Sequence, residues 1–170
     1  MAVEVLRNDE MLSNSYEPLR QHRWVFSIDQ NDIDGYTARS WARPVMSMGE
    51  TVIDYINEKR YLAGKAEPQS MTLTLNDPIA PSQSQAILRW IGQHYEQASG
   101  RAGYAEGTLG YKRRVFLKML DPNGAAVQTW ELKGTWIQNV DFGTLDYTSA
   151  EPVNITLTLR FDKFEVTQAQ

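Results

Sequence analysis

TVIDYINEKRYLAGK, residues 51–65, is typical of a β-hairpin, and it decides how the rest of the chain can be arranged. We expect two strands that fold back on each other across a turn at 57–59. Val52 and Ile56 lie on one face of the first strand and Ile53 on the other, because strand side chains alternate with a period of two. An isolated hairpin is marginally stable in water, so these side chains must pack on their own domain or on another molecule. The pattern alone favours the first arrangement.

The composition predicts one globular domain that is held together by packing. The chain has 170 residues, 42% hydrophobic and 22% charged, which is enough to bury a core. Its net charge is −4, whereas proteins that bind nucleic acids tightly are strongly basic. Because it contains 0 cysteines, disulfides, zinc–thiolate sites and iron–sulfur clusters are excluded. Neither a secretion signal nor a transmembrane run of about 18 apolar residues is visible.

Alternating apolar and polar residues predict a mainly β protein of the α+β class. Ser82 is a good N-cap and Gln85 follows at the spacing of a capping box, so we expect one helix at about 82–98. The predicted fold is a two-sheet β-sandwich or barrel with this helix on its flank and a protruding hairpin at about 51–65. Beside the hairpin, strands are expected over 23–29, 36–41, 70–76, 114–120, 126–132, 135–142 and 153–161.

The two ends of the chain differ from its middle. Residues 1–22 show no sustained periodicity, and we interpret them as an N-terminal arm. The β-sandwich domain is expected to span 23–163, and a short C-terminal tail to span 164–170.

A search for catalytic chemistry finds no convincing set of residues. The 2 histidines, His22 and His94, lie in no recognisable nucleophile motif, and His94 falls on the apolar stripe of the expected helix. The segment 32–35, DIDG, resembles part of a calcium loop, but Trp41 stands where that loop needs a bidentate glutamate. We therefore expect no enzymatic activity, no metal and no cofactor, and a chain that exists to assemble.

Short segments spread over residues 23–161 resemble the tail tube proteins of contractile-tailed bacteriophages. The match is carried by many points rather than by one motif. The segments are RWVF (23–26), YTA (36–38), DYIN (54–57), KRYLAGK (59–65), LNDP (75–78), HY (94–95), GRAGY (100–104), KMLDP (118–122), DFGTLDY (141–147) and LTLRF (157–161).

This resemblance implies a structural subunit of hexameric rings that stack into a hollow tube inside a contractile sheath, with kinship to the tubes of type VI secretion and R-type pyocins. The tube would be a conduit for DNA or effectors in a virion tail, assembled in the bacterial host cytoplasm. The implied partners are further copies of the chain, the tail sheath protein, and baseplate and tail-terminator proteins. DNA would pass through the lumen without specific binding.

Two sets of residues are candidates for assembly roles. In this family an extended hairpin or loop contacts the adjacent ring, and DNA must not adhere to the lumen, because each Lys or Arg contact with a phosphate adds affinity. The expected ring-to-ring contacts are Tyr55, Ile56, Asn57, Lys59, Arg60 and Tyr61. The polar faces expected to line the lumen are Thr72 and Thr74, or Asn154, Thr156 and Thr158.

Two alternatives share much of this pattern. One is another tube-like subunit of the same machine, at the baseplate or the tail end. The other is a monomeric β-barrel that binds a small ligand in an apolar pocket.

Overall fold

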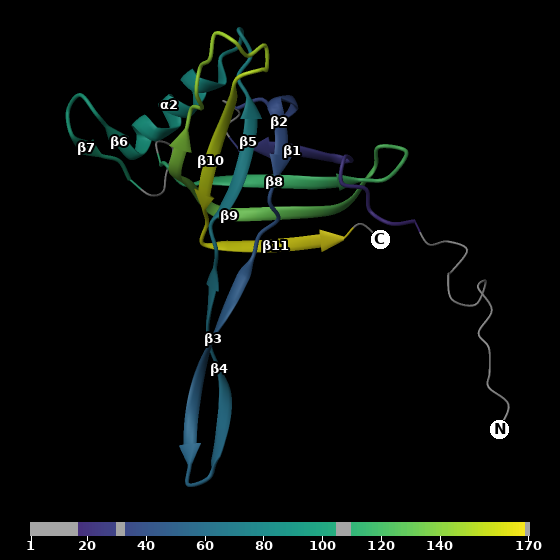
Figure 1. Cartoon of the computed structure of the whole chain (residues 1–170), viewed down its shortest axis with the longest axis vertical. Helices are drawn as coiled ribbons and strands as arrows, with labels where there is room; N and C mark the ends of the chain where they lie inside the picture. Colours follow the sequence, from purple (N-terminus) through teal and green to yellow (C-terminus); the bar gives the residue numbers. More distant parts are fainter. Residues whose placement is uncertain (1–16, 30–32, 105–109, 169–170) are drawn as a thin grey trace, which may run out of the picture.

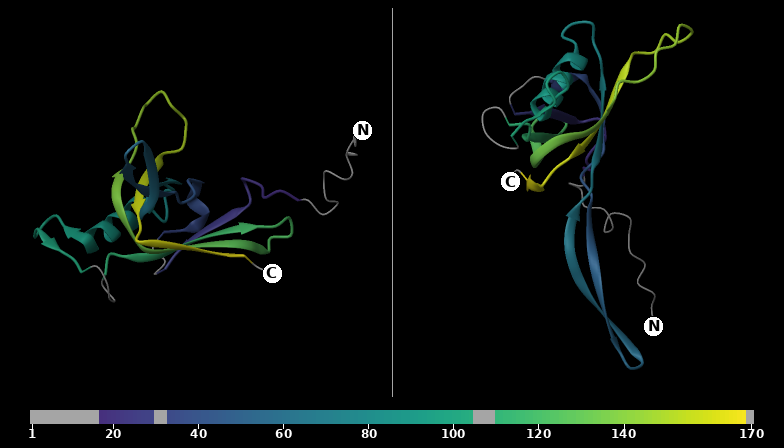
Figure 2. Two further views of the ribbon diagram at one scale, coloured as in Figure 1. Left: turned by 90° about the horizontal axis from the view of Figure 1, so that it is seen from below. Right: turned by 90° about the vertical axis from the view of Figure 1, so that its left-hand side faces the viewer.

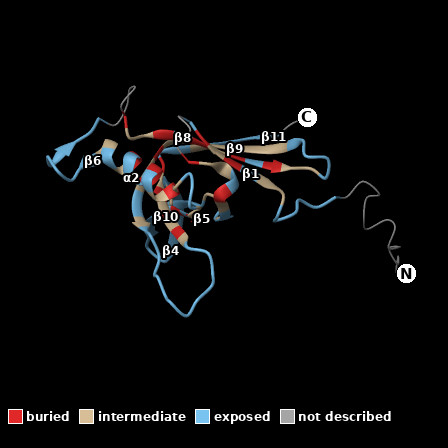
Figure 3. Ribbon diagram, turned by 90° about the horizontal axis from the view of Figure 1, so that it is seen from above, coloured by how far each residue is buried: buried red, intermediate tan, exposed pale blue. Residues whose placement is uncertain are grey.

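Strand alternation builds the core of the protein. The computed structural model describes residues 17–29, 33–104 and 110–168. In β10 (Asn154–Arg160), Ile155, Leu157 and Leu159 are completely buried, while the residues between them are half-buried. In β5 (Met71–Asn76), Leu73 and Leu75 are buried in the same way. The buried residues gather where the sheet strands meet the helix (Figure 3).

The main sheet is antiparallel throughout and has 7 strands in the order β1-β8-β9-β10-β5-β2, with β11 paired to β9. Two small two-stranded sheets, β3-β4 and β6-β7, complete the structure. The remaining bounds are β1 Trp24–Ile28, 3₁₀ helix η1 Gly35–Thr37, β2 Ala38–Trp41, β3 Met46–Tyr55, β4 Glu58–Pro68, α2 Gln83–His94, β6 Tyr95–Glu96, β7 Arg101–Ala102, β8 Arg113–Leu120, β9 Ala126–Asp141 and β11 Lys163–Gln168.

The 16-residue strand β9 belongs to two layers at once. Its first half pairs with β8 and β11, and its second half pairs with β10. In Figure 1, β8, β9 and β11 run across the view, whereas β5 and β10 run steeply along it. Gly134 has a φ of 68° between these halves, and a side chain there would collide with the Asp162 carboxylate. The two predicted strands 126–132 and 135–142 are therefore one bent strand. The predicted mainly β class is confirmed by the structure as a whole.

The helix α2 packs against the buried face of the bent sheet. Ala86, Ile87 and Trp90 are buried in the core, and the Trp90 indole N–H donates to the carbonyl oxygen of Tyr111 at 2.6 Å. The helix ends at His94 rather than near 98. The chain leaves it to form the β6-β7 hairpin, with Gly100 at a φ of 69° in the turn.

The predicted N-cap is wrong in one respect. Ser82 makes no capping hydrogen bond with its side chain. Instead the Asp77 carboxylate accepts from the backbone N–H of Gln83 at 2.8 Å and of Ser84 at 3.4 Å, and also from the Ser84 hydroxyl. A carboxylate from the preceding loop thus satisfies the free donors of the first helical turn.

The protruding hairpin is confirmed and is longer than the sequence indicates. β3 and β4 span 46–68, and Tyr55 pairs with Glu58, so the turn is Ile56-Asn57 rather than 57–59. The hairpin extends away from the body of the protein (Figure 2).

The two ends of the chain are only partly described. Of the predicted arm, residues 17–22 are exposed and contain no strand, and 1–16 lie outside the described residues. Residues 164–168, which we expected to be a tail, instead pair with β9 as most of β11.

The second predicted strand, 36–41, begins as η1 and becomes extended only at Ala38. In the part of the chain that the structure describes, no helix is long and apolar enough to cross a membrane.

Asp77→Ala should lower the free energy of unfolding at neutral pH by about 1 kcal/mol, because the cap of α2 is lost. Burial raises the pKa of Asp77, but hydrogen bonds from Ser84, Gln83 and Ser82 outweigh burial and lower it. The stabilisation is therefore present above the unfolded pKa and lost as the pH falls through the folded pKa. In urea unfolding, the difference in the free energy of unfolding between Asp77→Ala and the parent should become smaller below about pH 4. The control Ser82→Ala should change stability by less than about 0.5 kcal/mol, and an equal loss in both variants would contradict this assignment.

Candidate assembly surfaces

The hairpin β3-β4 is the most exposed apolar element of the described chain. Every residue of β3 and β4 except Pro68 is exposed. Among the predicted contact residues, the exposed fraction is 62% for Tyr55, 102% for Ile56 and 63% for Tyr61. Within the chain alone these side chains remain largely in contact with water, and such a surface is typical of an interaction site.

The strand register divides the hairpin into two faces, because directly paired residues point the same way. Tyr61 pairs with Val52, next to the pair formed by Asp54 and Lys59, on one face. The other face carries the pairs Ile53–Arg60, Tyr55–Glu58 and Thr51–Leu62. The predicted contact residues therefore lie on both faces, with Ile56 and Asn57 at the tip. Any molecule that buries them must surround the hairpin or meet it at its tip.

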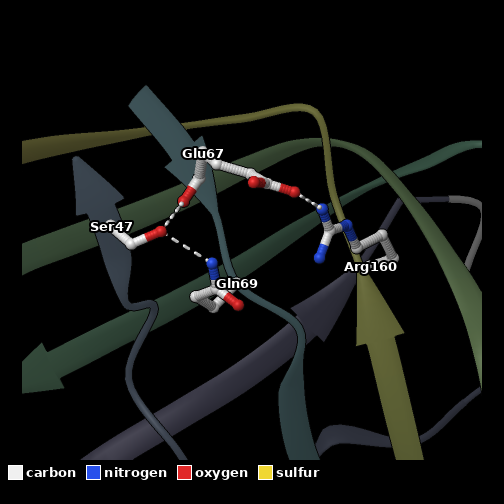
Figure 4. Close-up of polar contacts among 4 residues, drawn as sticks. All are labelled: Ser47, Glu67, Gln69 and Arg160. Atoms are coloured by element: carbon white, nitrogen blue, oxygen red, sulfur yellow. Dashed lines mark hydrogen bonds and ion pairs between the residues drawn. The ribbon is translucent and has the colours of Figure 1, made fainter. Parts of the chain in front are cut away.

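Polar contacts fix the base of the hairpin to the body (Figure 4). The Arg160 guanidinium of β10 donates to the Glu67 carboxylate of β4 at 3.2 Å. Across the hairpin, the Ser47 hydroxyl donates to the Glu67 carbonyl oxygen at 3.3 Å and accepts from the Gln69 amide at 2.8 Å. These contacts link both hairpin strands to the strand that carries the predicted lumen residues.

The two polar rows predicted as alternatives form one surface. Thr72 pairs directly with Thr158, and Thr74 with Thr156, across the β5-β10 ladder. Asn154 pairs with Asn76 at the end of the same ladder. All of the sequence-predicted lumen residues thus lie on the face of the sheet opposite the buried leucines.

This polar surface has three further members that the sequence pattern does not indicate. Ser40 of β2 pairs with Thr74, and Asn139 and Asp141 of β9 pair with residues of β10. A register shift in the β9-β10 ladder interrupts the alternation there, so the local pattern carries no clear signal. The surface therefore spans four strands, with uncharged side chains in its centre.

The described residues that the sequence offers for catalysis or metal binding either make packing contacts and hydrogen bonds or face solvent. The His94 ring lies 4.5 Å from the Tyr111 ring and 5.6 Å from the Trp136 ring, between centroids. His22 is exposed, Asp34 accepts from the Tyr36 hydroxyl at 3.2 Å, and Asp32 lies outside the described residues. Within residues 17–29, 33–104 and 110–168, no group of three or more His, Cys, Asp or Glu side chains could hold a metal ion.

Comparison with known proteins supports the resemblance seen in the sequence. No protein-family profile matches the chain. The chain is 24% identical to the tail tube protein of Serratia phage KSP90 over 152 residues, which cover 84% of this chain and 85% of the phage protein. The resemblance to tail tube proteins is confirmed.

Solved structures of an extracellular contractile injection system and of a type six secretion system protein are similar to this chain in fold. A chain from the sheath/tube terminator of PVC, an extracellular contractile injection system, has a TM-score of 0.71 at 15% identity, covering 90% of this chain and 99% of that one. A chain from the PVC sheath–tube complex has a TM-score of 0.64 at 16% identity, covering 96% and 100%. A type six secretion system protein has a TM-score of 0.50 at 8% identity, covering 85% and 82%. At these identities the comparison shows a common fold.

Substitutions should separate the hairpin from the core. Tyr61→Ser should change the free energy of unfolding by less than about 0.5 kcal/mol, because the side chain is exposed. Leu73→Ala, in the core, should cost about 2–5 kcal/mol. Urea unfolding of both variants tests this, and a loss at Tyr61 comparable to that at Leu73 would mean that the hairpin stabilises its own domain.

Proposed function

We propose that the chain is a structural subunit of hexameric rings that stack into a tail tube inside a contractile sheath, a conduit for DNA or effectors. The observation that carries this proposal is the hairpin β3-β4, exposed over its length and apolar on both faces. Similarity to the tail tube protein of Serratia phage KSP90 supports it. Tyr55, Ile56, Asn57, Lys59, Arg60 and Tyr61 would contact the neighbouring ring.

Ring formation would protect the ends of the main sheet. β1 and β2 end the strand order, so their outer edges present backbone groups that no strand of the main sheet pairs. Free edges invite uncontrolled association, and closing strands around a ring removes them. In the proposed tube, edges of neighbouring subunits pair with each other and form a continuous wall.

The polar surface of β5 and β10 would line the lumen. Its centre consists of Thr72, Thr74, Thr156 and Thr158, with Asn154 at one end, and these side chains carry no charge. The chain as a whole carries a net charge of −4. A wall without excess Lys or Arg releases few counterions from DNA, so DNA would pass without specific binding.

The proposed partners are the tail sheath, the baseplate and the tail terminator. A second candidate function is a tube-like subunit at one end of the tail. Chains from the anti-feeding prophage baseplate and from the PVC sheath/tube terminator support it, because both share this fold, with TM-scores of 0.70 and 0.71.

Shortening the hairpin should abolish stacking without unfolding the chain. Replacing residues 52–61 with Asn-Gly leaves the Thr51–Leu62 pair next to a two-residue turn. We expect unchanged far-UV circular dichroism, and isolated rings or monomers instead of tubes in negative-stain electron microscopy. The control Tyr104→Ser removes a tyrosine that is 82% exposed outside the hairpin and should leave tubes intact. Tubes of normal length from the shortened variant would refute the hairpin's role.

Cysteine labelling tests which face is enclosed, because the parent chain contains 0 cysteines. Thr72→Cys should react with a small maleimide in both tubes and disassembled subunits. In tubes it should react much more slowly with a maleimide carried on a large polymer, which enters the lumen poorly. The control is Thr167→Cys on β11, also exposed in the chain alone, which should react with both reagents in tubes. If tubes do not slow the reaction of Thr72→Cys with the large reagent, this surface does not face the lumen.

A further inference from the structure

An open groove lies between the two end strands of the main sheet. It has a volume of about 380 Å³ and is lined by residues that include Gln21, Trp24, Arg39, Trp41 and Met119. A second cavity, of about 810 Å³, shares Gln21, Trp24 and Arg39 with it and follows β1 toward η1. We call the two together the β1–β2 groove. Its lining includes the exposed side chains of Gln21 and Arg39, so a segment of another molecule can reach it.

The β1–β2 groove combines an apolar floor with unused polar groups. Trp24, Trp41 and Met119 supply aromatic and aliphatic surface. Arg39 and Arg43, at the rim, form no ion pair with any described residue. The guanidinium groups can pair with a carboxylate, so the groove fits an apolar segment that also brings one.

The tip of the hairpin has this chemistry. Tyr55 and Ile56 are exposed and apolar, and the Asn57 amide and the backbone carbonyls of the turn are acceptors. The Glu58 carboxylate, unlike Asp54, forms no ion pair among the described residues. We propose that the hairpin tip of one copy occupies the β1–β2 groove of a copy in the next ring, with Glu58 facing Arg39 and Arg43. This inference rests on the proposed stacking of rings.

The tip that enters the groove belongs to another copy because a chain cannot reach its own groove. The hairpin leaves the body soon after Trp41, and the 10 residues of β3 carry the tip roughly 33 Å from its base. A contact between a projection on one copy and a recess on another is heterologous, so it repeats from copy to copy without closing on itself. This type of contact suits a stack of indefinite length.

Pairs of introduced cysteines test the position of the tip in assembled protein. A chain carrying Ile56→Cys and Gln21→Cys should, with a short bismaleimide crosslinker, give a ladder of covalent oligomers on a denaturing gel. The control pair Ile56→Cys and Asn123→Cys places the second cysteine in the exposed β8-β9 turn and should give no ladder. Electron microscopy of each sample before crosslinking shows whether tubes have formed.

The outcomes separate this inference from the proposed function. Tubes with a ladder only from the Gln21 pair support the groove, whereas tubes without that ladder overturn it and leave stacking intact. Absence of tubes from the parent chain overturns the proposed function and this inference with it. A crosslink between Val5→Cys and Gln21→Cys in tubes, with the Ile56 pair silent, would mean that the N-terminal segment fills the groove and would overturn the inference.

A charge exchange gives an independent measurement. Glu58→Arg and Arg43→Glu should each reduce the pelletable fraction of tubes at least several-fold at low salt, because each places like charges together. Combining the two substitutions should restore most of the parent yield. If the double variant assembles no better than the worse single variant, Glu58 and Arg43 do not face each other.

Discussion

The strand β9 holds the two layers of the protein together through backbone hydrogen bonds. One half pairs with β8 and β11 and the other with β10, so neither layer can move without breaking pairs in a shared strand. Gly134 makes the bend possible because its φ of 68° is one that residues with a Cβ rarely adopt. Nearby, Lys112 pairs with Asp162 at 2.7 Å where the chain turns from β10 into β11. The core, the helix packed on it and the polar outer surface all take their positions from this bend.

The hairpin departs from the rule that a fold buries its own apolar residues. The body encloses a continuous core of leucine, isoleucine, methionine and aromatic side chains. The hairpin leaves Tyr55, Ile56 and Tyr61 in water, and it is attached through polar contacts at its base. An element of this kind contributes little to the stability of one chain. Its composition becomes understandable once the unit that buries apolar surface is taken to be an assembly of chains.

The sequence predicts the parts of the fold that depend on local alternation, and it fails where distant residues decide the outcome. Strict alternation around Leu73 and Leu157 identifies β5 and β10, but nothing local shows that they pair across about 80 residues and join two polar rows into one surface. The sequence suggests a break between 126–132 and 135–142, because the contact that requires glycine at position 134 is made with the distant Asp162. The local pattern predicts Ser82 as the N-cap of α2, although the carboxylate of Asp77 from the preceding loop makes the cap. The pattern of the hairpin alone favoured packing on its own domain, and this is wrong, because the structure leaves Tyr55, Ile56 and Tyr61 exposed.

The ion pair between Glu67 and Arg160 connects the hairpin to β10 at 3.2 Å, and its consequence is mechanical. Arg160 continues the side of β10 that bears Thr156 and Thr158, so this pair joins the base of the hairpin to the polar surface. In a tube of the kind we propose, force applied at the tip of a hairpin would reach its own subunit along the two hydrogen-bonded strands β3 and β4 rather than through a loose loop.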